Sequence, residues 1–263
     1  MRFFFGFCFG GLLSLLSLLP LASTAQANRV PDYNTLGWFQ YSGDHRLGPR
    51  WTLHTEYQAR RVHFMRAWQQ RLARAGLGYQ VLPRVQLAVD YTSFITHPYG
   101  DYPTAGTGVP FPERRLHEDV QLSDTMGRVT LMHRLRLEQR WLGQLPDDGR
   151  RTVQAWQYQN RVRYQLEAII PLQGHRLDDH EWFVNAFDEL FIGFGRNVAN
   201  NVFNQNRISA GLGYQVHQNL QVQTNYLYQI TQHSESDPAT SLPVFEFNHG
   251  VILGLTYNLG LVK

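Results

Sequence analysis

Charged residues recur at every second position in two neighbouring segments of the chain, 129–141 and 153–169. Each charge alternates there with an apolar or amide side chain, and the charged positions are Arg134, Arg136, Glu138, Arg140, Arg161, Arg163 and Glu167. A spacing of two puts such residues on one face of a β-strand. A guanidinium binds a carboxylate through two parallel hydrogen bonds. The pattern therefore indicates either an interior filled with ion pairs or a passage lined by charge.

Asp188, Glu189 and Arg207 extend this set farther along the chain. Adjacent residues of a regular strand point to opposite faces, so either Asp188 or Glu189 would point outward. If the strand crosses a membrane, as argued below, an outward carboxylate at the middle of the bilayer costs roughly 2 kcal/mol or more. We therefore expect a bulge that turns both carboxylates inward, or a position near the membrane interface. With this assumption, all ten residues form one predicted charge network.

A metal site and a hydrolytic site are the other chemistries to consider. His175, Asp178, Asp179, His180 and Glu181 cluster in one connection, but their spacing matches no established ligand pattern, and a solvated polar turn is favoured. No His-x-Ser sequence, as found in outer-membrane lipases, occurs in the chain. We predict no catalytic residue, no metal and no cofactor. A triad assembled from distant strands is left open, and a phospholipase or deacylase acting on membrane lipid is the alternative function.

The elements that must position these charges are β-strands. Apolar and polar residues alternate with period two in segment after segment, and no helical stripe extends over twelve residues. Eleven strands are predicted, near 35–43, 51–62, 68–82, 85–96, 114–125, 128–142, 153–169, 182–195, 204–216, 219–231 and 245–259. Residues 76–91 also align with 211–226, with eight identities in sixteen positions, which indicates a repeated strand-turn-strand unit.

The connections between these strands alternate between tight turns and long loops, which is typical of a transmembrane barrel. The fold class is therefore predicted as all-β, a closed antiparallel up-and-down transmembrane β-barrel. Single-chain bacterial barrels have an even number of strands, so we expect about twelve, within a range of ten to twelve.

The tryptophans distinguish a membrane barrel from a soluble one. Trp51 and Trp182 stand at the turn end of their strands, whereas Trp68, Trp141 and Trp156 stand at the long-loop end. Two such bands match the aromatic girdles that lie at headgroup depth on both sides of a membrane. A soluble barrel would bury its tryptophans in the middle of its strands.

The first 27 residues have the composition of a secretory signal. An apolar stretch follows Arg2, and Ala25-Gln26-Ala27 forms a cleavage site. We predict a signal peptide at 1–27 and a single barrel domain at 28–263. Cys8 is the only cysteine, so the mature chain has no disulfide and no thiolate metal site. These features predict the bacterial outer membrane as the location.

Paired arginines mark the long-loop ends, at Arg60, Arg61, Arg114, Arg115, Arg150 and Arg151. Guanidinium groups bind phosphate well, so contact with lipopolysaccharide is one hypothesis, and loop charges in water are the other. Runs of basic residues never exceed two, so the sequence contains no basic cluster of the kind that binds nucleic acid. The expected partners are outer-membrane lipids, lipopolysaccharide and the barrel-assembly machinery.

Alternation also predicts the charge inside the barrel. It turns nine arginines inward, Arg60, Arg74 and Arg115 among them, against six or seven carboxylates. The excess of two or three positive charges would give an open interior a weak preference for anions.

Four motifs carry a resemblance to a known family. They are His133 to Arg140, Arg161 to Tyr164, Asp188 to Gly195 and Asn201 to Arg207, and the last continues into Gly211 to Tyr214. In this order they resemble the bacterial domain-of-unknown-function family two-four-nine-zero, whose members are regarded as outer-membrane β-barrels. The resemblance implies the barrel and brings no known activity. The predicted function is a small passive pore or a structural, lipid-contacting barrel with an arginine-rich interior, and not an enzyme.

Overall fold

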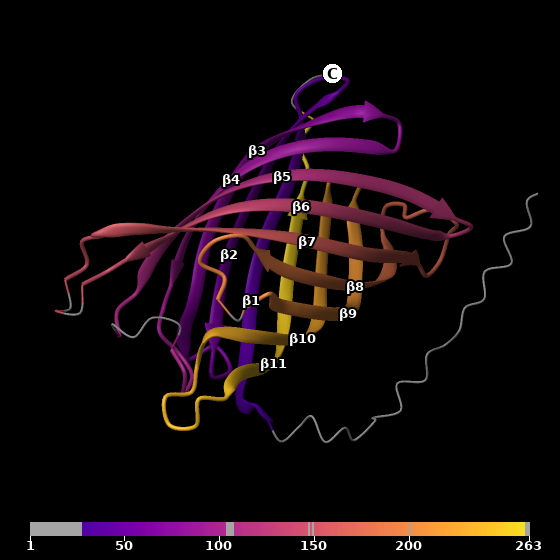
Figure 1. The fold of residues 1–263 in the computed structure, drawn as a ribbon. Helices are drawn as coiled ribbons and strands as arrows, with labels where there is room; N and C mark the ends of the chain where they lie inside the picture. The colour runs from indigo at the N-terminus through magenta and orange to yellow at the C-terminus, as the bar shows by residue number, and fades with distance from the viewer. Residues whose placement is uncertain (1–27, 104–107, 147, 149, 200, 261–263) are drawn as a thin grey trace, which may run out of the picture.

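The computed structural model describes residues 28–103, 108–146, 148, 150–199 and 201–260. Eleven β-strands in this part of the chain form one closed barrel (Figure 1). The described residues contain no helix that is long and apolar enough to cross a membrane. The predicted signal peptide, residues 1–27, lies outside the described residues.

The strands follow the predicted positions closely. Their bounds are β1 Val30–Arg46, β2 Trp51–Val62, β3 Ala67–Leu82, β4 Val85–Thr96, β5 Phe111–Met126, β6 Val129–Gln144, β7 Ala155–Pro171, β8 Glu181–Phe194, β9 Phe203–His217, β10 Leu220–Ser236 and β11 Pro243–Tyr257. Each strand pairs antiparallel with its neighbour in sequence. The all-β, closed-barrel prediction is therefore confirmed.

The number of strands differs from the even number that we expected. The barrel closes between β1 and β11, and these two strands pair in parallel, with Val30 opposite Val244 and Trp38 opposite Ile252. In Figure 1 the indigo first strand runs beside the yellow last strand. Because ten antiparallel steps separate the first strand from the eleventh, these two strands point the same way, and only a parallel seam can close this sheet. The count of eleven lies within the predicted range of ten to twelve, but the parity rule does not hold here.

The two ends of the barrel differ in their connections. The turn end carries 47–50, 83–84, 127–128, 172–180 and 218–219, and the loop end carries 63–66, 97–110, 145–154, 195–202 and 237–242. In the turn between β5 and β6, Gly127 has a φ of +64°, a conformation that glycine adopts without steric cost. All five loop-end connections are longer than the tight turns at 83–84, 127–128 and 218–219, although 172–180 at the turn end is long as well.

Alternation along each strand sorts the side chains by polarity. Large apolar and aromatic side chains project outward on every strand, as with Leu87, Val89 and Tyr91 on β4, which are about half exposed. The residues between them, such as Asp90 and Thr92, point inward and are buried. This polarity is inverted relative to a soluble protein, which buries its apolar residues.

Glycines in the repeated unit permit close packing inside the barrel. A Cβ atom at Gly211 would lie 2.5 Å from the Cα of Asn225, and one at Gly213 would lie 2.1 Å from a ring carbon of Phe183. The Phe183 ring, which is 1% exposed, thus lies over Gly213, where there is no side chain to obstruct it. Glycine at both positions therefore lets a neighbouring residue come close to the strand.

One sector of the interior is apolar. Leu36, Trp38, Val62, Leu227 and Ile252 form a buried cluster on β1, β2, β10 and β11. Tyr99, from the connection between β4 and β5, packs against this cluster, and its hydroxyl accepts a hydrogen bond from Gln69 at 3.1 Å. This burial raises the pKa of the Tyr99 phenol well above its usual value. The part of this connection around Tyr99 therefore folds into the mouth of the barrel.

Candidate functional site

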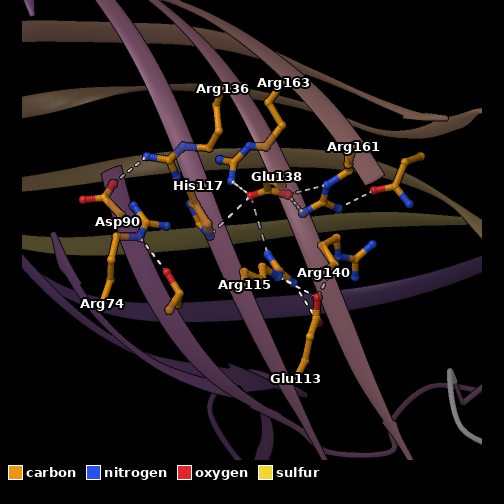
Figure 2. Close-up of polar contacts among 12 residues, drawn as sticks. Arg74, Asp90, Glu113, Arg115, His117, Arg136, Glu138, Arg140, Arg161 and Arg163 are labelled. Atoms are coloured by element: carbon orange, nitrogen blue, oxygen red, sulfur yellow. Dashed lines mark hydrogen bonds and ion pairs between the residues drawn. The ribbon is translucent and has the colours of Figure 1, made fainter. Parts of the chain in front are cut away.

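Glu138 lies at the centre of a charged network inside the barrel (Figure 2). The β6–β7 register places Glu138 opposite Arg161, and the β5–β6 register places it opposite His117. Its carboxylate accepts hydrogen bonds from Nε of Arg161 and Nη1 of Arg163, both at 2.7 Å. Arg115 Nη1 and His117 Nε2 approach it at 3.9 and 3.8 Å. The side chain has no exposed surface, so its charge is balanced entirely by these neighbours.

A second centre of the network lies two residues away from Glu138 along β6, at Arg136. Arg136 stands opposite Asp119 and donates from Nε to its carboxylate at 2.6 Å. Its Nη2 also reaches Asp90 on β4, 3.4 Å away. Arg136 is 2% exposed and is the largest of the fully buried side chains. It therefore joins three strands across the interior.

Glu189 on β8 is a third centre. It accepts hydrogen bonds from Arg163 Nε at 3.0 Å and from Arg134 Nη2 at 2.9 Å, and Arg207 Nη1 lies 3.7 Å from it. Arg163 consequently bridges Glu189 and Glu138. The predicted pairing of Arg161 and Arg163 with Glu138 is thus present, and it extends through Glu189.

The network continues towards the loop end through Glu113. This carboxylate accepts hydrogen bonds from Nε of Arg115 and from Nε of Arg140, each at 2.6 Å. On the opposite side, Arg74 pairs with Glu56 at 2.6 Å. The links to Glu113 were not predicted, because Glu113 lies just outside the segment that the sequence pattern assigned to its strand, whereas alternation had already turned Arg74 inward.

The network lies between two cavities in the interior. A cavity of about 410 Å³ lies on the loop side, where Arg60, Arg115, Arg140, Arg161 and Arg207 line it, and we call it the loop-side cavity. A smaller cavity of about 30 Å³ lies on the turn side, beside Asp90 and Arg136. The side chains between the two cavities, including His117 and Glu138, are 0% exposed. The described residues thus close the barrel across its middle.

Asp188 departs from the prediction. β8 keeps its regular alternation at this point, and the register irregularity between β8 and β9 comes later, at Phe191 and Ile192. Glu189 therefore points inward, whereas Asp188 points outward and is exposed. Its carboxylate accepts a hydrogen bond from Asn206 at 2.6 Å. The expected bulge is absent from β8 at this position, and Asp188 does not belong to the network.

Glu167 occupies an inward position of β7, in alternation with Arg163. It is partly buried and forms none of the ion pairs described above. Of the ten predicted network residues, Glu167 is thus turned towards the others without a direct salt bridge, Asp188 is turned away, and the remaining eight form ion pairs within it.

The paired arginines at the loop ends divide between the two faces. Arg60 and Arg115 point inward and are buried, so the prediction that they contact lipopolysaccharide is wrong for these two. Their neighbours Arg61 and Arg114 point outward and stack on Trp68 and Trp156, at 4.2 and 4.5 Å from the ring centroids. Alternation within a strand explains this division.

Arg150 and Arg151 lie in the connection between β6 and β7 and are exposed. Arg150 donates from Nε to Asp148 at 2.7 Å. This hydrogen bond lowers the pKa of the Asp148 carboxyl group below its usual value. Both arginines remain available to a partner in solution or at a membrane surface.

Three buried carboxylates were missed by the sequence count. Asp32, Glu113 and Glu246 lie near the loop ends of their strands and point inward. Asp32 and Glu113 precede the strand starts that the pattern predicted. Together they cancel the positive excess that alternation predicted, so the interior as a whole carries no strong net charge.

The connection between β7 and β8 holds His175, Asp178, Asp179 and His180. Asp179 approaches His217 at 3.7 Å, and the His180 and His217 rings meet edge to face at 5.2 Å. Within the described residues, no group of three or more His, Cys, Asp or Glu side chains is arranged to hold a metal ion.

The model of one protein family, described as "Protein of unknown function (DUF2490)", matches residues 35–240. This match covers most of the chain and nearly the whole barrel. The chain belongs to the DUF2490 family. The motifs from His133 to Arg140 and from Asp188 to Gly195, on which the resemblance rested, thus supply both central carboxylates of the DUF2490 barrel's network. No curated protein and no solved structure matches the chain significantly.

Proposed function

We propose that this chain is a bacterial outer-membrane β-barrel with a structural, lipid-contacting role. Its charged network closes the middle of the interior and blocks passage through the barrel. The observation that carries the proposal is the inverted polarity of the wall. Outward positions hold exposed leucine, valine and tyrosine, and inward positions hold paired charges and amides. A surface of this kind is costly in water and favourable in hydrocarbon.

Aromatic pairs at both ends of the barrel support this location. Trp51 packs on Tyr79 at the turn end, and Trp141 packs on Tyr158 at the loop end, with ring centroids 4.8 and 5.4 Å apart. Amphipathic rings in two bands suit the two headgroup layers of a membrane. Arg114, stacked on Trp156, adds a cation at the depth where lipid phosphates lie.

The closed interior favours the structural role over the passive pore. A conducting barrel needs a continuous wet path, whereas here Glu138, His117 and Arg136 are at most 2% exposed. Ion pairs that join β4, β5, β6, β7 and β8 across the interior instead brace the wall.

The outward face of the barrel gives the lipase alternative no support. Two histidines on the outward face, His133 and His249, contact tyrosines: His133 Nδ1 lies 2.8 Å from the Tyr164 hydroxyl, and His249 bonds the Tyr226 hydroxyl. A hydrolytic triad requires a nucleophile beside its base. For these two histidines the hydrogen-bonding neighbour among the described residues is a phenol rather than a serine.

The proposal is tested by cell fractionation combined with planar-bilayer recording. The protein should appear in the outer-membrane fraction, migrate differently on gels before and after boiling, and give no steady conductance when it is inserted in its folded form. Recovery as a soluble periplasmic monomer would contradict the membrane location. A steady single-channel current from the folded protein would instead contradict the closed interior.

A further inference from the structure

The loop-side cavity contains two arginines whose positive charge the network compensates only weakly or not at all. Arg115 and Arg140 share Glu113, and Arg161 binds Glu138. Arg60 instead donates to two neutral amide oxygens, those of Gln58 at 2.7 Å and Gln70 at 2.8 Å.

Arg207 is also poorly compensated. Its nearest carboxylate is Glu189 at 3.7 Å, and that group already binds Arg163 and Arg134. Among the residues that the structure describes, no carboxylate forms an ion pair with Arg60. Two guanidinium groups that border one cavity therefore carry positive charge that no close carboxylate balances, and an anion would balance it.

Trp38 holds these two arginines together. The guanidinium carbon of Arg60 lies 4.1 Å from the centroid of the Trp38 ring, and that of Arg207 lies 5.0 Å from it. Trp38 itself is 3% exposed and donates from its indole nitrogen to Gln69 at 3.0 Å. Stacking on a fixed aromatic ring restricts the motion of both arginines, so a bound anion loses less entropy in ordering them.

The amides of the cavity lining match a hydroxylated ligand. Eight of the lining residues are glutamines, which offer both donors and acceptors, and Tyr99 and Phe111 add aromatic surface. A volume of about 410 Å³ falls within the range of small-molecule sites. Hydroxyl groups suit the amides, and a phosphate suits the paired guanidiniums.

We propose that the loop-side cavity binds a phosphorylated saccharide, with its phosphate held by Arg60 and Arg207. The ligand enters from the loop end and stops at the charged network, because Glu138 and His117 close the floor. The site is a receptor-like cavity and not a stage of a transport path. This assignment does not depend on where the barrel is located in the cell.

Isothermal titration calorimetry on the purified, folded barrel tests the site. The probe is glucose 6-phosphate, with glucose and inorganic phosphate as comparison ligands. Glucose 6-phosphate should bind at least tenfold more tightly than either comparison ligand, since only this probe uses both the guanidiniums and the amides. Absence of binding, or equal binding of glucose, would overturn the proposal.

Variants assign the binding to the two arginines. Arg60→Gln and Arg207→Gln should each weaken glucose 6-phosphate at least tenfold, and Arg60→Lys should lose less because it keeps the charge. Arg84→Gln is the matched control, because Arg84 lies at the turn end, 66% exposed, and pairs with Asp124. Each variant must keep the gel shift of a folded barrel, and Arg60→Lys provides the test if Arg60→Gln does not fold. Unchanged affinity in the folded arginine variants would refute the assignment.

A competition arm distinguishes the two sources of such a ligand. If purified lipopolysaccharide displaces glucose 6-phosphate, the natural ligand is a phosphorylated sugar of a lipid headgroup. If it does not, the ligand is a free sugar phosphate. Either result supports the site, because both require that glucose 6-phosphate binds first.

Discussion

The carboxylate of Glu138 on β6 accepts a hydrogen bond from Nε of Arg161 on β7 at 2.7 Å, in a pair of residues directly opposite in the sheet. Because Glu138 is fully buried, this bond and the one from Arg163 replace the water that the carboxylate would have in the unfolded chain. Removing one member of such a pair leaves an uncompensated charge in the interior. The relation between Glu138 and Arg161 therefore makes the network a source of stability that can be measured.

Glu138→Gln should lower the free energy of unfolding by about 3–5 kcal/mol, because Arg161 and Arg163 lose their shared counter-ion. Urea titration of the folded barrel, followed by tryptophan fluorescence, measures this change. Asp148→Asn is the control, since Asp148 pairs with Arg150 at an exposed loop position, and there we expect no measurable change. Equal stability of the two variants would show that the buried network does not stabilise the barrel.

Shortening the side chains that separate the two cavities should open a path through the interior of the barrel. Arg136 and His117 lie between the two cavities, and together they contribute two of the largest fully buried side chains. The double variant Arg136→Ala, His117→Ala should give a steady single-channel current in planar bilayers, whereas the wild-type protein gives none. Arg84→Ala, at the exposed turn end, should remain silent. A folded double variant that conducts no current would place the barrier elsewhere in the interior.

Period-two alternation made most of this fold predictable, because one apolar face and one polar face specify each strand and its register. The predicted 51–62 and 85–96 match β2 and β4 at both ends. Asp188 could not be placed, since the expected bulge was inferred from the cost of an outward carboxylate and not from a local signal. The prediction of an even number of strands was wrong for a similar reason. A general rule on bacterial barrels replaced the count of eleven, which the pattern itself supported.

The loop-side cavity depended on contacts that no linear pattern contains. Alternation turned Arg60 and Arg207 inward, but their shared position on Trp38 arises only because β1 lies between β2 and β11 in the closed sheet. Tyr99 reaches the mouth through the fold of a connection rather than through strand periodicity. Long-range closure thus created the candidate site from residues that the sequence could assign only to a face.

Asp188→Leu should stabilise the barrel in lipid. Asp188 is an outward, exposed carboxylate on β8 whose hydrogen-bond partner is Asn206. If its surroundings are hydrocarbon, replacement by leucine removes a desolvation cost of about 1–2 kcal/mol. Urea unfolding in liposomes measures the gain, with Asp188→Asn as the comparison that keeps the polar shape. A loss of stability for Asp188→Leu would indicate that this position faces a protein partner or the headgroup layer.

The parallel seam has a consequence for the ends of the chain. β1 and β11 run in the same direction, so Val30 lies at the loop end beside Val244, while Tyr257 lies at the turn end. If the loop end faces outward, a tag inserted after Asn28 should be reachable on intact cells. A tag after Ala239, in the connection between β10 and β11, should be equally reachable, whereas one after Gly127 should be stained only in permeabilised cells.

These three tags test two properties independently: the orientation of the barrel in the membrane, and whether its number of strands is odd or even. Reversed staining of all three would mean that the barrel is inverted in the membrane, with the parallel seam intact. If the Ala239 tag is reachable and the Asn28 tag is hidden, β1 must run antiparallel to β11. That result would contradict the parallel register between Val30 and Val244 and would restore an even number of strands. Equal reactivity at Asn28 and Ala239 is therefore the outcome that an eleven-strand barrel requires.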